Sequence, residues 1–181
     1  MSRMFKNPAE AGFFLFCMLL HSCLTKRGDM ETIFFTGIVC IILIVIAVTD
    51  ARQKKIPNIL LGALCVAAIF SAVVYPEMTW KDRIVGSVSV SAILLAVTWI
   101  RRGAFGAGDV KLMAVSGLLL GTGKNLTAFL FAVVMATVYC LPGVIWGDRK
   151  STSEIAFGPF LCMGIVLSIF FGEKFIQWYM S

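Results

Sequence analysis

Charge is scarce in this sequence. Only 14% of its 181 residues are Asp, Glu, Lys or Arg, whereas 59% are hydrophobic. Soluble domains carry about 25% charged residues, which argues against a soluble globular fold. The chain also lacks the alternation of apolar and polar residues that a membrane β-barrel requires. The composition therefore predicts an all-α, polytopic membrane protein.

Histidine and paired cysteines are lacking as well. His21 is the single histidine, and the six cysteines form no CxxC pair. One histidine near the N-terminus does not complete a Ser–His or Cys–His arrangement, and no serine lies in a GxSxG context. Zinc sites need clustered Cys and His ligands. We therefore expect no metal and no cofactor, and we interpret the cysteines as small apolar packing residues.

Long apolar runs are what the chain has instead. A helix needs about 20 apolar residues to cross a hydrocarbon core of about 30 Å. The sequence predicts six transmembrane helices, at residues 32–48, 59–75, 84–100, 110–120, 126–146 and 155–171. The fourth is short unless the glycine-rich residues before it are included. Residues 31–181 are expected to form one six-helix membrane domain without an internal repeat.

Residues 1–30 form a separate N-terminal segment, for which three interpretations stay open. Arg3 and Lys6 precede a short apolar stretch at residues 11–20, as in a signal peptide. The same stretch is also compatible with a short extra membrane helix. The third interpretation is that translation begins at Met30.

Basic residues predict the orientation of the helices. Lys and Arg cluster in short loops between the apolar runs, so the net charge of +6 indicates membrane topology rather than nucleic-acid binding. The loops after the first, third and fifth helices hold Arg52, Lys54, Lys55, Arg101, Arg102, Arg149 and Lys150. The opposite loops hold Lys81, Arg83 and Lys124, partly offset by acids. We therefore expect the first set of loops in the cytoplasm and the C-terminus outside.

Two acids lie at helix ends on the predicted cytoplasmic side. Asp50 ends the first helix and Asp109 begins the fourth. Two complete crossings separate them, so both carboxyl groups must face the same side. Asp50 lies at a helix C-terminus, where the macrodipole disfavours an anion. Asp109 follows Gly106 and Gly108, which allow backbone or substrate to approach closely. Such placements are costly unless the acids have a function.

The pair admits several interpretations. Asp109 could cap its helix, and Asp50 could be an interfacial charge neutralised by Arg52 or Lys54. Two carboxyl groups held close together cannot both ionise easily, so the pair could act as acid and base, as in aspartic proteases. Paired acids also serve proton relays in small transporters. A non-catalytic assembly factor that keeps the fold is the third alternative.

Three short motifs lie at the helix ends near the two acids. Gly106-Ala107-Gly108-Asp109 has the form GxGD, and Lys111 continues it as GxGDxK. A second segment holds Asp50, Arg52, Pro57 and Asn58, and a third is Phe157-Gly158-Pro159-Phe160. Together these motifs resemble those of the intramembrane aspartic proteases with a GxGD motif, and in particular of the type IV prepilin peptidase family. The resemblance covers roughly residues 31 to 175, and its strength comes from the order of the motifs at helix ends.

The resemblance implies a six-helix endopeptidase of the bacterial cytoplasmic (inner) membrane with its active site at the cytoplasmic face. It implies Asp50 and Asp109 as the catalytic pair. The supporting residues that it implies are Gly106, Gly108, Lys111, Arg52, Pro57, Asn58, Gly158 and Pro159. The implied partners are membrane lipid and the helix of a prepilin or pseudopilin, which is cut after a glycine that follows a basic leader.

Larger members of the family also N-methylate the new terminus, through an added N-terminal part with a CxxC-containing loop. This sequence has no CxxC pair and is similar to the short, peptidase-only type that serves tight-adherence (Flp-like) pili. A basic leader suits an acidic surface, yet Lys and Arg surround the expected site. Lipid phosphates are the expected partners of these basic residues.

Overall fold

The computed structural model describes residues 30–100, 105–145 and 156–180. Residues 1–29 of the N-terminal segment and the basic residues Arg101, Arg102, Arg149 and Lys150 lie outside these ranges. The chain divides into two compact units, residues 1–37 and 38–181. The contacts given below all lie within the second unit.

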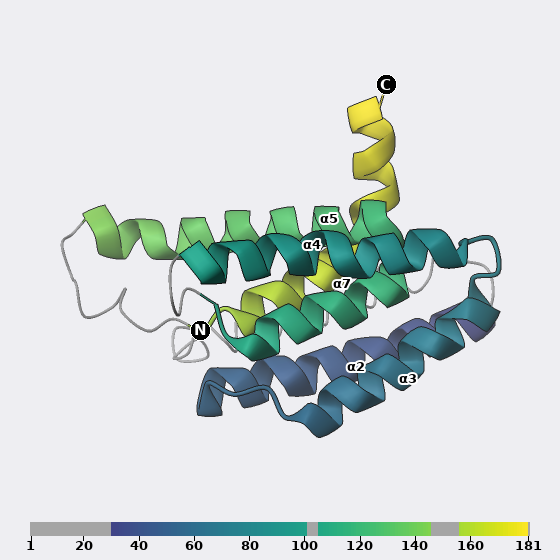
Figure 1. Ribbon diagram of the computed structural model, residues 1–181, viewed down its shortest axis with the longest axis horizontal. Helices are drawn as coiled ribbons and strands as arrows, with labels where there is room; N and C mark the ends of the chain where they lie inside the picture. The colour runs from purple at the N-terminus through teal and green to yellow at the C-terminus, as the bar shows by residue number, and fades with distance from the viewer. Residues whose placement is uncertain (1–29, 101–104, 146–155, 181) are drawn as a thin grey trace, which may run out of the picture. The chain divides into compact units, whose positions relative to one another are not determined.

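The described residues form five helices (Figure 1). They are α2 (Met30–Gln53), α3 (Asn58–Val74), α4 (Trp80–Ile100), α5 (Ala107–Ile145) and α7 (Gly158–Met180). Four stretches within them are long and apolar enough to cross a membrane: Glu31–Gln53, Trp80–Ile100, Ala107–Leu141 and Gly158–Tyr179. The helix α3 is a shorter apolar helix of 17 residues. The predicted all-α, polytopic membrane class is thereby confirmed.

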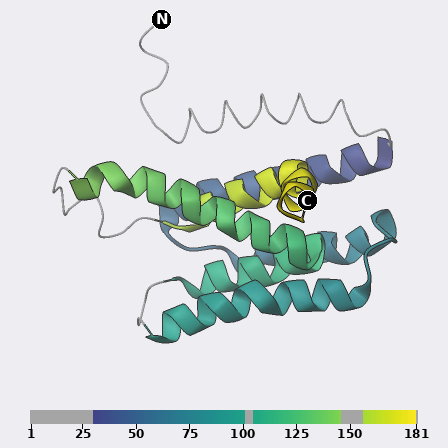
Figure 2. The same ribbon diagram turned by 90° about the horizontal axis from the view of Figure 1, so that it is seen from above.

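Helix α5 is a hairpin of two antiparallel segments. Its non-helical residue is Gly121, with φ 75° and ψ −178°, a conformation that suits glycine. Asn125 Nδ2 donates to the carbonyl oxygen of Met113 at 3.2 Å, although a straight helix would place these residues about 18 Å apart. The chain therefore reverses at Gly121, as both ribbon views show (Figures 1 and 2). Segments 107–120 and 122–145 correspond to the fourth and fifth predicted helices.

Small residues allow α4 to pack closely against both segments of α5. A Cβ atom added to Gly86 would lie 2.6 Å from the carbonyl carbon of Gly121, and one added to Gly117 would collide with the Gly86 backbone. The side chain of Asn125 is fully buried. It donates to the carbonyl oxygen of Gly86 at 2.9 Å and accepts from the hydroxyl of Ser116 at 2.8 Å. Close backbone approach and buried hydrogen bonds of this kind join helices in membranes.

Arg83 is buried, although the sequence suggested a loop charge. Its side chain is only 1% exposed and lies in the first turn of α4. Its guanidinium donates to the carbonyl oxygens of Ser71 and Tyr75 (3.1 Å each) and of Leu118 (2.9 Å), and to the Ser71 hydroxyl (2.5 Å). These carbonyl groups belong to the C-terminal ends of α3 and of segment 107–120. Helix C-termini leave carbonyls unsatisfied and carry partial negative charge, so one cation closes both helix ends.

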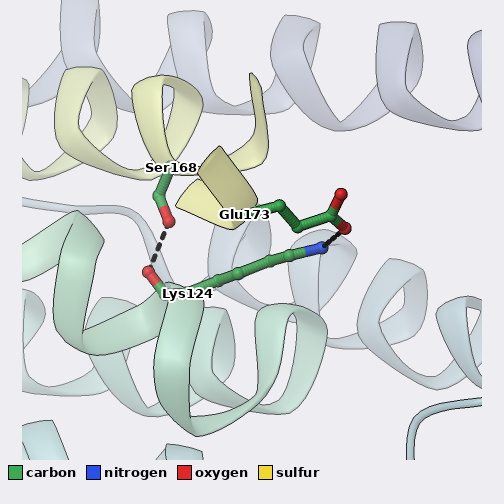
Figure 3. A network of polar contacts seen from close by, with 3 residues as sticks. All are labelled: Lys124, Ser168 and Glu173. Carbon is green, nitrogen blue, oxygen red and sulfur yellow. Dashed lines mark hydrogen bonds and ion pairs between the residues drawn. The ribbon is translucent and has the colours of Figure 1, made fainter. Parts of the chain in front are cut away.

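Helix α7 runs antiparallel to segment 122–145. Lys124, near the start of that segment, forms an ion pair of 2.6 Å with Glu173, near the end of α7. The Ser168 hydroxyl donates to the carbonyl oxygen of Lys124 (Figure 3). At the other end, the rings of Tyr139 and Phe160 lie 5.4 Å apart. The first turn of α7 is therefore at the same end of the bundle as the start of α5.

Exposed aromatic side chains mark the two ends of α4. Trp80 is 58% exposed and Trp99 is 87% exposed. The helix rise of 1.5 Å per residue separates them by about 28 Å, close to the hydrocarbon thickness of about 30 Å. Tryptophan favours both membrane–water interfaces. The apolar face exposed between them includes Ile84, Val85, Val88 and Leu95, which suits contact with lipid.

We predict that Arg83→Met lowers the free energy of unfolding by about 3 kcal/mol, because it leaves buried carbonyl groups without donors. The measurement is the thermal unfolding of the purified protein in detergent. Lys81→Met removes a neighbouring but exposed cation and should stay within about 0.5 kcal/mol of the wild type. Equal stability of the two variants would contradict the role assigned to Arg83.

Candidate active site

Asp50 and Asp109 come together at one end of the bundle. Asp50 is 5% exposed and Asp109 is 7% exposed, and their carboxyl groups are close enough to interact electrostatically. Asp50 lies in the last turn of α2 and Asp109 in the first turn of α5. Helices α3 and α4 cross the bundle between them, which returns the chain to the end where α2 finished. The crossing count made from the sequence thus places the two acids at the same end.

The end of α2 is fixed by its capping geometry. The helix continues past Asp50 to Gln53, five residues beyond the predicted range of 32–48. Lys54 then adopts a left-handed conformation (φ 51°) and donates its N–H to the carbonyl oxygen of Asp50 at 2.7 Å. This is the arrangement that usually has glycine after a helix. It ends α2 directly after the turn that carries Asp50.

Four residues, 54–57, separate the end of α2 from the start of α3. Pro57 is the N-cap residue, with φ −64°. Its carbonyl oxygen accepts the N–H groups of Leu60 and Leu61. Asn58 is the first residue of α3, and its side chain is exposed, as is that of Arg52. Both exposed side chains therefore remain available at the surface beside the pair.

Asp109 is tied to the residue that precedes its helix. The N–H of Gly106 donates to Asp109 Oδ2 at 3.2 Å, and the carbonyl oxygen of Gly106 accepts the N–H groups of Asp109 and Val110. Asp109 is the third residue of α5, the position from which an acid reaches back in a capping box. The capping bond thus orients the Asp109 carboxyl group, which stays close enough to Asp50 to interact with it.

Gly158 lies directly against Asp50. Its N–H donates to the Asp50 carboxyl group, and a Cβ atom added to Gly158 would lie 2.8 Å from Asp50 Cγ. Gly158 is the first residue of α7, and a helix N-terminus favours negative charge. The C-terminus of α2 disfavours the negative charge of Asp50, and the N-terminus of α7 offsets this effect. Pro159 sits in the same first turn, where its missing N–H costs nothing.

The remaining predicted residues lie around the pair. Gly106 is exposed and Gly108 is half-buried. The side chain of Lys111 is exposed, unlike the buried Asp109 two residues earlier. Lys111 therefore borders the site without entering it.

Two features of the site were missed by sequence reasoning. Cys162 is buried one helical turn after Gly158, and its thiol is close enough to interact electrostatically with both carboxyl groups. The spacing of four residues from Gly158 was a signal for this, because residues at i and i+4 share a helix face. The rings of Phe105 and Phe157, which precede α5 and α7, lie 5.0 Å apart. This pair joins the two segments that approach the site.

Among the described residues, no group of three or more His, Cys, Asp or Glu side chains is placed to hold a metal ion. The thiols of Cys40, Cys65, Cys140 and Cys162 are free. What the described site offers chemically is therefore a buried pair of carboxyl groups beside two helix N-termini.

Comparison with known proteins places the chain in a family. Residues 37–141, which include both acids, match the type IV leader peptidase family, and the chain belongs to that family. The matched region ends before α7, so Gly158 lies outside it.

Several curated relatives are named prepilin leader peptidase/N-methyltransferase. The protein of Bacillus subtilis is 29% identical over 86% of this chain and 63% of its own length. That of Aeromonas salmonicida is 19% identical over 77% of this chain and 50% of its own length. That of Burkholderia pseudomallei is 26% identical over 75% and 46%. The chain thus spans about half to two thirds of the length of these relatives. No solved structure is a significant match.

We predict that Gly158→Ala lowers the thermal stability, because the new methyl group meets the Asp50 carboxyl group. An overpacked contact of this kind costs about 1–3 kcal/mol. In an Asp50→Ala background the same substitution should cost much less, since the carboxyl group is gone. Unfolding of the four proteins in detergent gives the coupling between the two positions.

Gly62→Ala is the matched control. A Cβ atom at Gly62 meets nothing within 4 Å, and alanine is favoured over glycine inside a helix. Stability should stay equal or rise. Additive effects of Gly158→Ala and Asp50→Ala would contradict the contact.

Proposed function

We propose that residues 31–181 form an aspartic endopeptidase of the bacterial cytoplasmic membrane that removes the basic leader of type IV prepilins or pseudopilins, cutting after glycine. The observation that carries the proposal is the meeting of Asp50 and Asp109, two buried acids from distant parts of the chain whose carboxyl groups interact. Membership of the type IV leader peptidase family supports the substrate class.

The proposed reaction uses one carboxyl group as base and the other as acid. The ionised group takes a proton from a water molecule, whose oxygen attacks the carbonyl carbon of the scissile peptide bond. The protonated group gives its proton to the carbonyl oxygen. When the C–N bond breaks, the group that took the water proton gives it to the leaving nitrogen. The other group takes a hydroxyl proton from the tetrahedral intermediate, so the pair returns to its starting state. Two close carboxyl groups with different protonation suit both roles.

Two helix N-termini support such a pair. Asp109 accepts the N–H of Gly106 at the start of α5, and Asp50 accepts the N–H of Gly158 at the start of α7. These contacts hold the carboxyl groups in place and stabilise the single negative charge that the pair needs. Preorganised donors of this kind need no rearrangement during the reaction.

The proposed membrane face is the cytoplasmic one. Arg52, Lys55 and Lys111 are exposed beside the two acids, and basic residues mark the cytoplasmic end of membrane helices. We propose lipid phosphates as their partners and the apolar helix of the substrate as the partner of the site. The N-methyltransferase activity in the names of the relatives is not part of the proposal, and neither are a cofactor and a nucleic-acid partner.

We predict that Asp50→Asn and Asp109→Asn each abolish cleavage, because neither role can be filled by an amide. The double variant should be little worse than either single one, since residues that act as a unit are not additive. The measurement is cleavage of a prepilin-like peptide, with glycine before an apolar helix, by the purified full chain in detergent.

Glu77→Gln is the matched control for these variants. Glu77 is an exposed acid in the turn between α3 and α4, at the opposite end of the bundle, and its variant should cleave at the wild-type rate. If the Asp50 and Asp109 variants fold and keep substantial activity, the aspartic protease proposal is wrong. A proton relay in a transporter would then be the leading alternative.

We predict that Lys111→Met reduces the cleavage rate only partly. The side chain is exposed, so it supports the glycine stretch or contacts lipid rather than reacting atoms. Comparing the rates of the variant and the wild type at saturating peptide separates an effect on the reaction from an effect on peptide binding. Loss as complete as that of Asp109→Asn would assign Lys111 to the reaction itself.

A further inference from the structure

We propose that Ile56 is a positioning residue, which sets the separation of Asp50 and Asp109 by resting on the backbone of Gly108. The inference rests on the proposed peptidase function. It deepens that function by assigning a role to Ile56, the residue before Pro57, and to the glycine next to Asp109.

The contact itself is close and extends along the whole Ile56 side chain. A Cβ atom added to Gly108 would lie 3.1 Å from Cβ, 3.2 Å from Cγ1 and 3.3 Å from Cδ1 of Ile56. These distances are shorter than ordinary carbon contacts of about 3.5–4.0 Å. A methyl group at position 108 would therefore fit only if the Ile56 side chain or the Gly108 backbone moved by a few tenths of an ångström.

Ile56 has little freedom to move relative to Asp50. Only five residues separate the two positions, and the turn between them is held by the Lys54 N–H on the Asp50 carbonyl oxygen at 2.7 Å. Lys54 keeps a left-handed conformation, which costs about 1–2 kcal/mol for a residue with a Cβ atom. Pro57 restricts Ile56 to an extended conformation, and its carbonyl oxygen is already bonded to the start of α3.

Gly108 is fixed equally well on the side of Asp109. It lies directly before that residue, inside the turn where the Gly106 carbonyl oxygen accepts the Asp109 N–H at 3.0 Å. The contact therefore connects two short, capped segments, one ending α2 and one starting α5. Any change in the distance between the Ile56 side chain and the Gly108 backbone moves one carboxyl group relative to the other.

This assignment differs from the usual reason for a glycine beside a catalytic acid. The sequence alone suggested that Gly108 leaves room for backbone or substrate to approach. In the structure that room is filled by Ile56, so the missing side chain determines the geometry of the pair. The two interpretations make different kinetic predictions, because a lost substrate contact raises KM whereas a misplaced acid lowers kcat.

The test compares Gly108→Ala, Ile56→Ala and the double variant in the cleavage assay with the full chain. Gly108→Ala should lower kcat by about 10-fold with KM nearly unchanged, since small displacements of reacting groups are costly. Ile56→Ala alone should lower kcat less. The double variant should cleave faster than Gly108→Ala, because removal of Cγ1 and Cδ1 makes room for the new methyl group. Gly62→Ala, with open space around it, should match the wild type.

Three results would overturn the assignment: full activity of Gly108→Ala, a rise in KM at constant kcat, or a double variant as slow as the product of the two single effects. A wild-type protein that does not cleave would reject the proposed function instead. In that case the melting temperatures of the wild type, Gly108→Ala, Ile56→Ala and the double variant test the contact. A double variant more stable than Gly108→Ala supports the contact, and additive losses overturn it.

Discussion

The guanidinium group of Arg83 is the interaction on which the arrangement of the helices depends. It binds the carbonyl ends of α3 and of segment 107–120 at one point, where unsatisfied groups would be costly in an apolar surrounding. Asp82, its neighbour, accepts the N–H of Thr122 at 3.3 Å and so caps the second segment of α5. These two residues make the reversal at Gly121 possible. The reversal in turn allows α7 to bring Gly158 back to the two acids.

The sequence alone was sufficient for the coarse features of this site. Hydropathy predicted the helical class, and the count of crossings placed Asp50 and Asp109 at one end. Helix boundaries were less accurate: α2 ends five residues after the predicted range of 32–48, because Lys54, which is not a usual capping residue, closes it in a left-handed conformation. The fourth and fifth predicted helices were separated correctly, at the reversal of α5 around Gly121.

What could not be predicted depends on contacts between distant residues. Nothing local indicates that Arg83 is buried, because its partners on α3 and α5 are known only once the helices pack. The same holds for Ile56 on Gly108 and for Asp50 on Gly158, where the decisive quantity is the distance between a side chain and a glycine backbone. Glycine in a sequence indicates close approach without identifying what approaches. In this protein the answer differs between the two glycines: one receives an apolar side chain and the other a carboxyl group.

The close contact between Gly86 and Gly117 also determines the depth of the two acids. With the helices side by side at that point, Trp99 lies about 20 Å further along α4, whereas Asp109 lies only about 12 Å along segment 107–120 in the same direction. Measured along the helix axes, Asp109 therefore lies about 8 Å nearer the middle of the bundle than Trp99. Lysine and arginine stems can span such a depth. In the proposed reaction, the positive charges of a leader would remain among the lipid headgroups while its glycine descends to the acids.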